Sequence, residues 1–126
     1  MPERKRKNIV KQLDTIFSIY IRKRKSKNNI AECYTCGKKD HYKNLQCGHF
    51  ISRKHYATRW NETNCQVQCY ACNVARYGVQ FKFGMFLNAE YGKNVAEQLL
   101  LESKQVVKYS NSDLIEKIEH YKKLVN

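Results

Sequence analysis

Residues 33–72 read CYTCGKKDHYKNLQCGHFISRKHYATRWNETNCQVQCYAC, and this stretch begins and ends with a Cys-x-x-Cys pair. The first pair is Cys33 and Cys36, and the second is Cys69 and Cys72. Four thiolates satisfy tetrahedral zinc, and the segment between the pairs is long enough for a hairpin to leave and return. The spacing therefore predicts a structural zinc site. The alternatives are buried thiol clusters or one redox-active pair, and neither explains why the spacing occurs twice.

Other residues of this stretch limit what the zinc can do. Gly37 follows the first pair and permits the tight backbone that such a turn uses. Cys47 and Cys65 lie outside the pairs, and we interpret them as small strand residues that face the core rather than as ligands. Because four thiolates leave zinc no open position, the predicted site performs no reaction itself. Any reaction must come from the residues that the zinc holds in place.

The composition is that of a small basic protein. The chain has 126 residues, with 24 Lys and Arg against 11 Asp and Glu, a formal net charge of +13 and 42% hydrophobic residues. We expect one domain (1–126) with a basic arm and helix (1–28), a zinc-stabilised core (29–80) and a C-terminal helical part (81–126). No apolar run approaches the roughly 20 residues that span a bilayer, and no signal-peptide pattern is present, so we expect a cytoplasmic protein with reduced cysteines.

Positive charge is concentrated near the N-terminus. Residues 1–27 contain ten Lys or Arg and two acids, Glu3 and Asp14. A strong positive field favours polyanions because phosphate contacts release condensed counterions. DNA, RNA and an anionic membrane surface are all compatible with this charge, and so is a role in solubility alone.

Hydrophobic periodicity predicts an α+β fold with helices at both ends. A helix over residues 7–25 is indicated by the three- and four-residue spacing of Ile9, Val10, Leu13, Ile16, Phe17, Tyr20 and Ile21. Strands are expected over 45–52 and 64–69, and a short helix over 70–77 that ends at Gly78. Further helices are expected over 95–103 and 113–125, the last with Ser112 as N-cap.

The order of the polar motifs resembles that of a known nuclease group. The motifs are Gln46-Cys-Gly-His49-Phe-Ile-Ser-Arg53, Trp60-Asn-Glu-Thr-Asn64 and a QCYACN segment that ends at Asn73. Together they resemble the His-Me finger (HNH) nucleases of the endonuclease VII type. More closely, residues 30–103 resemble the NinG/Rap family of phage recombination endonucleases. The resemblance implies a small zinc-stapled ββα-metal core, with the long N-terminal helix and the C-terminal helices around it.

The same resemblance implies roles for three residues. His49 would be the general base, because a neutral imidazole can take a proton from water as it attacks phosphorus. Asn73 would bind a catalytic Mg²⁺ or Mn²⁺ through its amide oxygen, and cleavage would leave a 5′-phosphate and a 3′-hydroxyl. Asn64 would pin the loop between the two strands and so position the base.

The chain departs from this group at one position. The endonuclease VII type has an aspartate directly before its histidine as a second metal ligand, and this chain has Gly48 there. Gln46 would share the face of residue 48 on a strand, and its amide oxygen is a replacement candidate. Asp40, His41 and His55 are the other candidates.

The function that the resemblance implies is metal-dependent cleavage of branched recombination intermediates, such as Holliday junctions and displaced-strand joints. Arg53, Lys54, Arg59 and Arg76 are candidates for DNA contacts, with Tyr56 and Trp60 available for base stacking or core packing. The expected partners are DNA and a recombination protein but no membrane, in the cytoplasm of a bacterial host if the chain is phage-encoded. The apolar stripe of the N-terminal helix serves either a homodimer or the chain's own core.

Two functions of other classes are also compatible with the sequence. A non-catalytic zinc-dependent module could bind nucleic acid through the basic arm, and Gly48 in place of the carboxylate favours it. A redox protein could use one Cys-x-x-Cys pair, in which case the folded protein would have reactive thiols.

Overall fold

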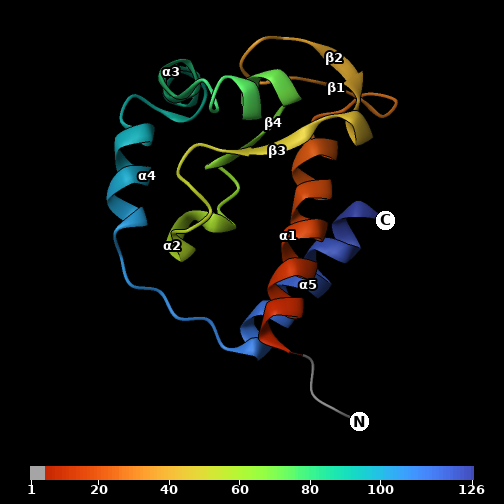
Figure 1. Ribbon diagram of the computed structural model, residues 1–126, viewed down its shortest axis with the longest axis vertical. Coiled ribbons are helices and arrows are strands. Elements are labelled where there is room, and N and C mark those ends of the chain that lie inside the picture. Colours follow the sequence, from red (N-terminus) through yellow and green to blue (C-terminus); the bar gives the residue numbers. More distant parts are fainter. Residues whose placement is uncertain (1–4) are drawn as a thin grey trace.

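The computed structural model describes residues 5–126, in which two small antiparallel sheets lie among helices (Figure 1). The elements follow in the order α1 (Arg6–Lys23), β1 (Ile30–Glu32), β2 (Lys39–His41), the 3₁₀ turn η1 (Tyr42–Asn44), β3 (Gln46–His49), α2 (Tyr56–Arg59), β4 (Cys65–Gln68), the π-helical η2 (Ala71–Ala75), α3 (Gln80–Tyr91), α4 (Val95–Ser103) and α5 (Asn111–Val125). The predicted α+β class is confirmed. No helix in this part of the chain is both long and apolar enough to cross a membrane.

The two ends of the described chain pack against each other. Helices α1 and α5 lie side by side (Figure 1), and their apolar faces meet in one core cluster, made of Ile9, Leu13, Phe17, Ile21, Trp60, Cys65, Leu114, Ile118 and Tyr121. Burying side chains of this size contributes about 1.5–3 kcal/mol each. The stripe of α1 is therefore covered by the chain's own α5, and a homodimer would need another surface.

The central hairpin is formed by β3 and β4, which pair antiparallel with His49 opposite Cys65 and Gly48 opposite Gln66. Because opposite residues share a face and neighbours alternate, His49 and Cys65 lie on the same face as Cys47. That face turns toward α1, where Cys65 joins the core and Cys47 packs against it. Cys65 is a core-facing strand residue, as interpreted, and Cys47 points the same way but is only partly buried.

The strands of this hairpin are shorter than predicted. The backbone N–H of Phe50 still donates to the carbonyl of Asn64 at 2.9 Å, but that of Ile51 donates to the side chain of Asn64 at 2.8 Å. The backbone hydrogen bonds between the strands therefore end at Phe50, because the next N–H bonds to the Asn64 side chain instead. The observed bounds are Gln46–His49 and Cys65–Gln68, against the predicted 45–52 and 64–69.

The predicted helices are observed with changes at their ends. The first helix is Arg6–Lys23, and Val95–Ser103 agrees with its prediction. The last helix begins at Asn111, and its N-cap is Ser110, so the assignment to Ser112 is wrong. Of Ser110 and Ser112, only Ser110 has an acid three residues later. The Ser110 hydroxyl accepts from the N–H of Asp113 at 3.0 Å, and the Asp113 carboxylate accepts from the N–H of Ser110 at 2.9 Å.

The segment after β4 is helical but irregular. The helix predicted over 70–77 is π-helical over Ala71–Ala75, and Gly78 follows it with a φ of 86°. Helix α3 then begins without a side-chain cap, after Val79 at a φ of 51°. The sequence predicted a helical part here but no separate helix, since the apolar residues of Gln80–Tyr91 do not form one stripe.

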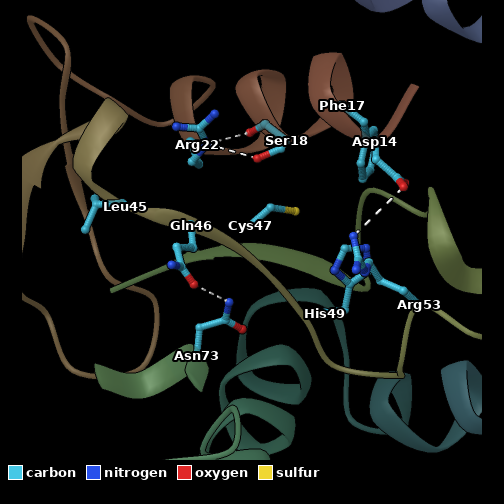
Figure 2. Close-up of a pocket in the computed structure, with 10 residues that line it drawn as sticks. All are labelled: Asp14, Phe17, Ser18, Arg22, Leu45, Gln46, Cys47, His49, Arg53 and Asn73. Carbon is cyan, nitrogen blue, oxygen red and sulfur yellow. Dashed lines mark hydrogen bonds and ion pairs between the residues drawn. The ribbon is translucent and has the colours of Figure 1, made fainter. Parts of the chain in front are cut away.

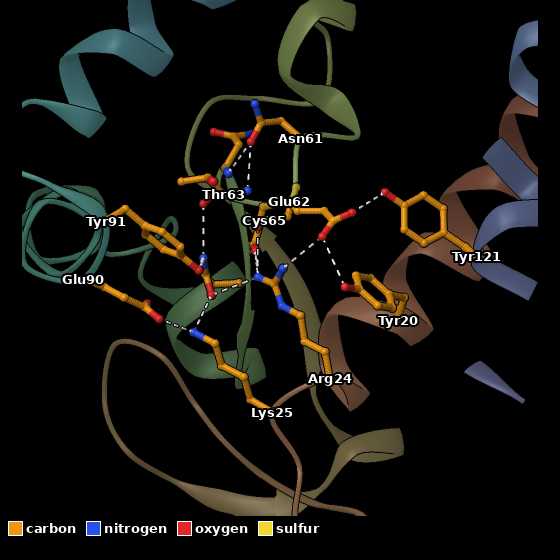
Figure 3. A network of polar contacts seen from close by, with 12 residues as sticks. Tyr20, Arg24, Lys25, Asn61, Glu62, Thr63, Cys65, Glu90, Tyr91 and Tyr121 are labelled. Atoms are coloured by element: carbon orange, nitrogen blue, oxygen red, sulfur yellow. Dashed lines mark hydrogen bonds and ion pairs between the residues drawn. The ribbon is translucent and has the colours of Figure 1, made fainter. Parts of the chain in front are cut away.

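A polar network centred on Glu62 ties the two terminal helices to the segment that enters β4 (Figure 3). The Glu62 carboxylate accepts hydrogen bonds from the hydroxyls of Tyr20 at 3.2 Å and Tyr121 at 2.9 Å. Arg24 donates to the backbone carbonyls of Glu62 and Cys65, both at 2.9 Å. The network fixes the chain on both sides of Asn64.

Candidate functional site

The four cysteines of the two Cys-x-x-Cys pairs meet beyond the end of β4. Their sulfur atoms all lie within 4.8 Å of one another, and the Sγ atoms of Cys36 and Cys69 are 3.6 Å apart. Zn–S bonds of about 2.3 Å at tetrahedral angles place sulfurs about 3.8 Å apart. Cys33, Cys69 and Cys72 are buried, and Cys36 is exposed. The tetrad could hold a zinc ion, as its spacing predicts.

The backbone of the first pair is shaped for a tight turn. Gly37 has a φ of 80°, a conformation that favours glycine, and its N–H donates to the carbonyl of Cys33 at 2.9 Å. Burial raises the pKa of the Cys33 thiol, but hydrogen bonds from the backbone of Cys69 and from Thr35 outweigh burial and lower this pKa to about 6. Cys33 therefore favours the thiolate, which is the form that binds metal. A hydrogen bond from the Lys38 backbone lowers the pKa of Cys36, but burial and hydrogen bonds with the other three thiols outweigh it and raise this pKa to about 12.

A cavity of about 560 Å³ lies beside β3, between α1 and η2 (Figure 2). Its lining consists of Asp14, Phe17, Ser18, Arg22, Leu45, Gln46, Cys47, His49, Arg53 and Asn73. Because β3 is paired with β4 on one side only, side chains from both of its faces reach the cavity. The cavity thus brings together His49, Gln46 and Asn73, which the sequence assigned to one site.

The orientation of His49 is fixed by a backbone carbonyl. Its Nε2 lies 3.0 Å from the carbonyl oxygen of Arg59. A carbonyl oxygen can only accept, so Nε2 carries the proton and Nδ1 has the lone pair. Burial lowers the pKa of His49 below 6.5, and the positive charge of Arg53 acts in the same direction. The imidazole is therefore neutral at neutral pH, the state that a general base requires.

Asn64 is buried and pins the loop that joins the strands. Its Oδ1 accepts from the N–H of Ile51 at 2.8 Å, and its Nδ2 donates to the carbonyls of Ile51 at 3.1 Å and Thr58 at 3.0 Å. Thr58 precedes Arg59, whose carbonyl orients His49. These contacts agree with the positioning role expected for Asn64.

Gln46 and Asn73 face each other across the cavity mouth (Figure 2). The Nδ2 of Asn73 donates to the Oε1 of Gln46 at 2.7 Å. Turning the Asn73 amide over would bring its oxygen beside that of Gln46, an arrangement that a cation between them stabilises, and amide oxygens are ligands that Mg²⁺ accepts. The pair fits a divalent ion that takes its remaining ligands from water and phosphate.

The other candidates for a second metal ligand lie elsewhere. The Asp40 carboxylate accepts from the side chain of Asn44 at 3.0 Å and from the N–H of His41 at 2.7 Å. The ring of His41 accepts from the N–H of Lys43 at 3.1 Å. Neither residue, nor His55, lines the cavity in the described part of the chain.

The structure explains why position 48 carries no carboxylate. Gly48 is buried, and a Cβ atom built on it would overlap the side-chain amide of Gln68. Gln68 is itself held by hydrogen bonds from its Nε2 to the Thr35 hydroxyl and the Gly78 carbonyl, both at 3.0 Å. Only glycine fits at position 48 with Gln68 in this place.

Asp14 is a pocket residue that the sequence did not assign to the site. Its carboxylate forms an ion pair with Arg59, accepts from the indole N–H of Trp60 at 3.0 Å and lies 3.9 Å from Arg53. The sequence holds one indication of this role, which is that Asp14 is an acidic residue among the basic residues of the first helix. Asp14 fixes the segment whose Arg59 carbonyl orients His49.

The predicted DNA-contact residues divide into two groups. Arg53, Lys54 and Arg76 are exposed. Arg59 instead donates to Asp14 through Nε and Nη2 and to the carbonyl of Arg53 through Nη1, so its donors already have partners within the chain and its contact with phosphate stays a prediction. Arg22, which was not assigned, lines the cavity beside Ser18.

Two aromatic residues left open by the sequence have packing roles. Trp60 belongs to the core cluster and stacks against Tyr56, with ring centroids 5.3 Å apart. Tyr56 is half-buried and packs against the same cluster. Both rings stabilise the α2 segment that carries the Arg59 carbonyl.

The chain was compared with known families, curated proteins and solved structures. A family model described as the bacteriophage lambda NinG protein matches residues 2–126. No curated protein and no solved structure matches the chain.

Proposed function

The chain belongs to the family of the bacteriophage lambda NinG protein, and on that premise we propose that it is a metal-dependent endonuclease that cuts branched DNA. In this proposal the β3–β4 hairpin and the helical segment η2 form a ββα-metal core that the zinc tetrad staples. The observation that carries the proposal is the placement of a neutral, oriented His49 in the same cavity as the Gln46–Asn73 amide pair.

His49 would act as the general base. A water molecule would attack phosphorus and give its proton to Nδ1 of His49, while the bond from phosphorus to the 3′ oxygen breaks. The 3′ oxygen leaves with the bonding electron pair and takes a proton from solvent, which gives a 3′-hydroxyl and a 5′-phosphate. The hydrogen bond from Nε2 to the Arg59 carbonyl stabilises the imidazolium that forms. A positioned base of this kind typically contributes about 10²–10⁴ in rate.

The amide pair would hold the catalytic cation. When bound by Asn73 and Gln46, Mg²⁺ or Mn²⁺ supplies positive charge to the phosphoryl oxygens as negative charge develops there. Arg22 and Arg53 line the same cavity and would add phosphate contacts. With Asp14 already paired to Arg59, no carboxylate among the described residues completes the amide pair.

Two exposed aromatic side chains follow Asn73 along the sequence. Tyr77 is 88% exposed and Phe81 is 84% exposed, and both lie close in sequence to Arg76. Aromatic rings stack on unpaired bases in a sequence-independent way, at about 1–3 kcal/mol per base. Branch points offer such bases, so these rings support a branched substrate over a plain duplex.

A nicking assay with zinc-loaded protein tests the proposal. Four-way junction, flap and linear duplex DNA are incubated with Mg²⁺ or Mn²⁺ and with wild type, His49→Ala or His120→Ala. His120 is exposed on α5 and serves as the matched control. We expect wild type and His120→Ala to cut the junction or the flap, and His49→Ala to bind the same DNA without cutting it.

A second function is favoured by one observation, which is that only neutral amides form the candidate cation site. Under this alternative the protein is a non-catalytic, zinc-dependent module that binds nucleic acid. Tight binding of every DNA, with no cleavage under either ion, would support the module and contradict the nuclease.

A further inference from the structure

A second group of metal-binding side chains lies on the α1-facing side of the central hairpin. It consists of Cys47, His49 and Cys65, whose ligand atoms all lie within 4.8 Å of one another. Cys47 and His49 are two residues apart on β3, and Cys65 is directly opposite His49 on β4. We call these three residues the triad. It shares no residue with the cysteine tetrad.

The triad has the donor set of a zinc site with an open position. Two thiolates and an imidazole are known zinc ligands, and three protein ligands leave a fourth position for water. Two thiolates and a neutral imidazole also cancel the charge of a divalent ion, so the nearby Arg22 and Arg24 do not oppose occupation. Soft thiolates select zinc over Mg²⁺, which prefers oxygen.

His49 is already held as metal-binding histidines usually are. Such a histidine donates its other ring N–H to a carbonyl or a carboxylate, which fixes the tautomer and the ring orientation. Here Nε2 lies 3.0 Å from the Arg59 carbonyl, which leaves Nδ1 for a metal. The Sγ of Cys65 lies 3.6 Å from the same carbonyl oxygen, so Cys65 and the Nε2 of His49 share one acceptor.

The triad is also accessible. Cys65 is fully buried, but Cys47 and His49 are only partly buried and line the 560 Å³ cavity. A metal ion can therefore reach them from solvent while Cys65 closes the site from inside.

From these observations we propose that the triad binds a second zinc ion, more weakly than the tetrad, and that this ion inhibits DNA cleavage by occupying His49. The inhibitory part rests on the proposed nuclease function, because the lone pair that binds zinc is the one that would accept the proton from water. The binding part does not depend on it.

Metal titration without DNA tests the binding part. Protein with one equivalent of zinc is kept reduced and titrated with Co²⁺, which reports thiolate ligation by its charge-transfer absorption. Wild type should take up a second equivalent with thiolate bands. Cys47→Ala should bind that equivalent at least about tenfold more weakly, since even the loss of a hydrogen-bond partner of a ligand costs about 10- to 100-fold in affinity.

Controls separate the triad from the rest of the chain. Cys47 is only partly buried, so its replacement should keep the fold, and retention of the first zinc together with the circular dichroism spectrum verifies this. Cys65→Ala provides a second, independent variant. Absence of a second equivalent in wild type, or its persistence with unchanged bands in both variants, would overturn the proposal.

Zinc inhibition tests the regulatory part. Cleavage of branched DNA at saturating Mg²⁺ is measured with added Zn²⁺, and each variant is compared with its own zinc-free rate. The zinc concentration that halves the rate should rise at least about tenfold in Cys47→Ala, in parallel with the loss of binding. Equal inhibition of both proteins would overturn regulation through the triad. A wild type that never cuts DNA would instead contradict the proposed nuclease, and the titration would still decide the binding site.

Discussion

The triad lies on the β3–β4 hairpin and the tetrad beyond its end, and the two groups differ in the number of ligands that they offer. The tetrad combines four thiols beyond the end of β4, whereas the triad combines two thiols and an imidazole beside a cavity of about 560 Å³. Four thiolates complete the coordination of zinc and leave nothing to react. Three ligands leave one position open. A closed group therefore suits stability, and an open one suits chemistry.

The surroundings of the two groups reinforce this difference. Three of the four tetrad cysteines are buried; Cys69 directly follows β4, and Cys72 lies within η2. The triad instead depends on a contact from α1, because Asp14 pairs with the side chain of Arg59, whose carbonyl orients His49. The tetrad thus joins two short local turns, whereas the orientation of His49 in the triad depends on a distant helix.

The largest expected effect is the loss of a tetrad ligand. Replacing the buried Cys72 by serine should release zinc and unfold the protein near room temperature. Zinc binding contributes roughly 10–16 kcal/mol in small zinc-binding peptides, which matches or exceeds the whole stability of a small domain. Zinc content and thermal unfolding measured by circular dichroism check this.

Cys47→Ser is the matched control for the tetrad, because it changes a thiol of the triad. It should keep one tightly bound zinc and a Tm close to that of wild type. If Cys72→Ser kept its zinc and its Tm, the tetrad would not be the zinc site that stabilises the fold.

The next effect concerns the loop that joins β3 to β4. Asn64→Ala removes three hydrogen bonds and takes away the side-chain partner of both the N–H and the carbonyl of Ile51, whereas the Thr58 carbonyl still accepts from the N–H of Asn61 at 3.2 Å. We expect a loss of about 2–4 kcal/mol in the free energy of unfolding, measured by urea denaturation. Asn44→Ala, on the exposed η1 turn, should cost no more than about 0.5 kcal/mol. Equal losses of unfolding free energy in the two variants would show that Asn64 does not hold the loop in place.

A smaller effect should sharpen the chemistry of the cavity. In wild type the Nδ2 of Asn73 donates to the Oε1 of Gln46 at 2.7 Å. Gln46→Glu keeps an oxygen acceptor there and adds a negative charge beside the candidate cation site. One additional charge at about 4 Å is worth at least about 1 kcal/mol, so the Mg²⁺ concentration for half-maximal cleavage should fall about five- to tenfold. Gln12→Glu, on α1 and outside the cavity lining, is the control. No change in the Mg²⁺ requirement would place the cation elsewhere.

The smallest effect is the pH dependence that His49 brings. Burial lowers its pKa below 6.5, so the cleavage rate should be level at neutral pH and fall as the pH drops through this lowered pKa and the base becomes protonated. Stability should change in the same direction, because the unfolded chain binds a proton near pH 6.5 that the folded site disfavours. His49→Gln should lose this contribution in urea denaturation at pH 5 against pH 7. A rate that increases on acidification would contradict a neutral base.

The sequence predicted those parts of the molecule that depend on local pattern. The tetrad follows from two Cys-x-x-Cys pairs, and α1 follows from one apolar stripe. Helix α3 was not separately predicted because its apolar residues point in several directions, with Phe83 and Leu87 buried while Phe81 and Met85 are exposed. The cap of α5 was misplaced because two serines were available, and only the position of Asp113 distinguishes them.

The sequence named some residues of the cavity lining, such as His49, but not Asp14 or Arg22, and it did not show how these residues are connected. His49, Asn64 and Asn73 were chosen from their motifs, and the structure adds how they are held. The ion pair between Asp14 and Arg59 joins residues 45 positions apart, which no local pattern reveals. The triad likewise appears only once the register places His49 opposite Cys65.

The most direct test of the central claim is the rate of junction cleavage under single-turnover conditions, measured for wild type and His49→Ala at equal zinc content and equal DNA occupancy. The account predicts a rate about 10²–10⁴-fold lower for His49→Ala, with unchanged DNA affinity. Equal rates for the two proteins would contradict the assignment of His49 as the base, and no cleavage by wild type under any divalent ion would contradict the nuclease itself.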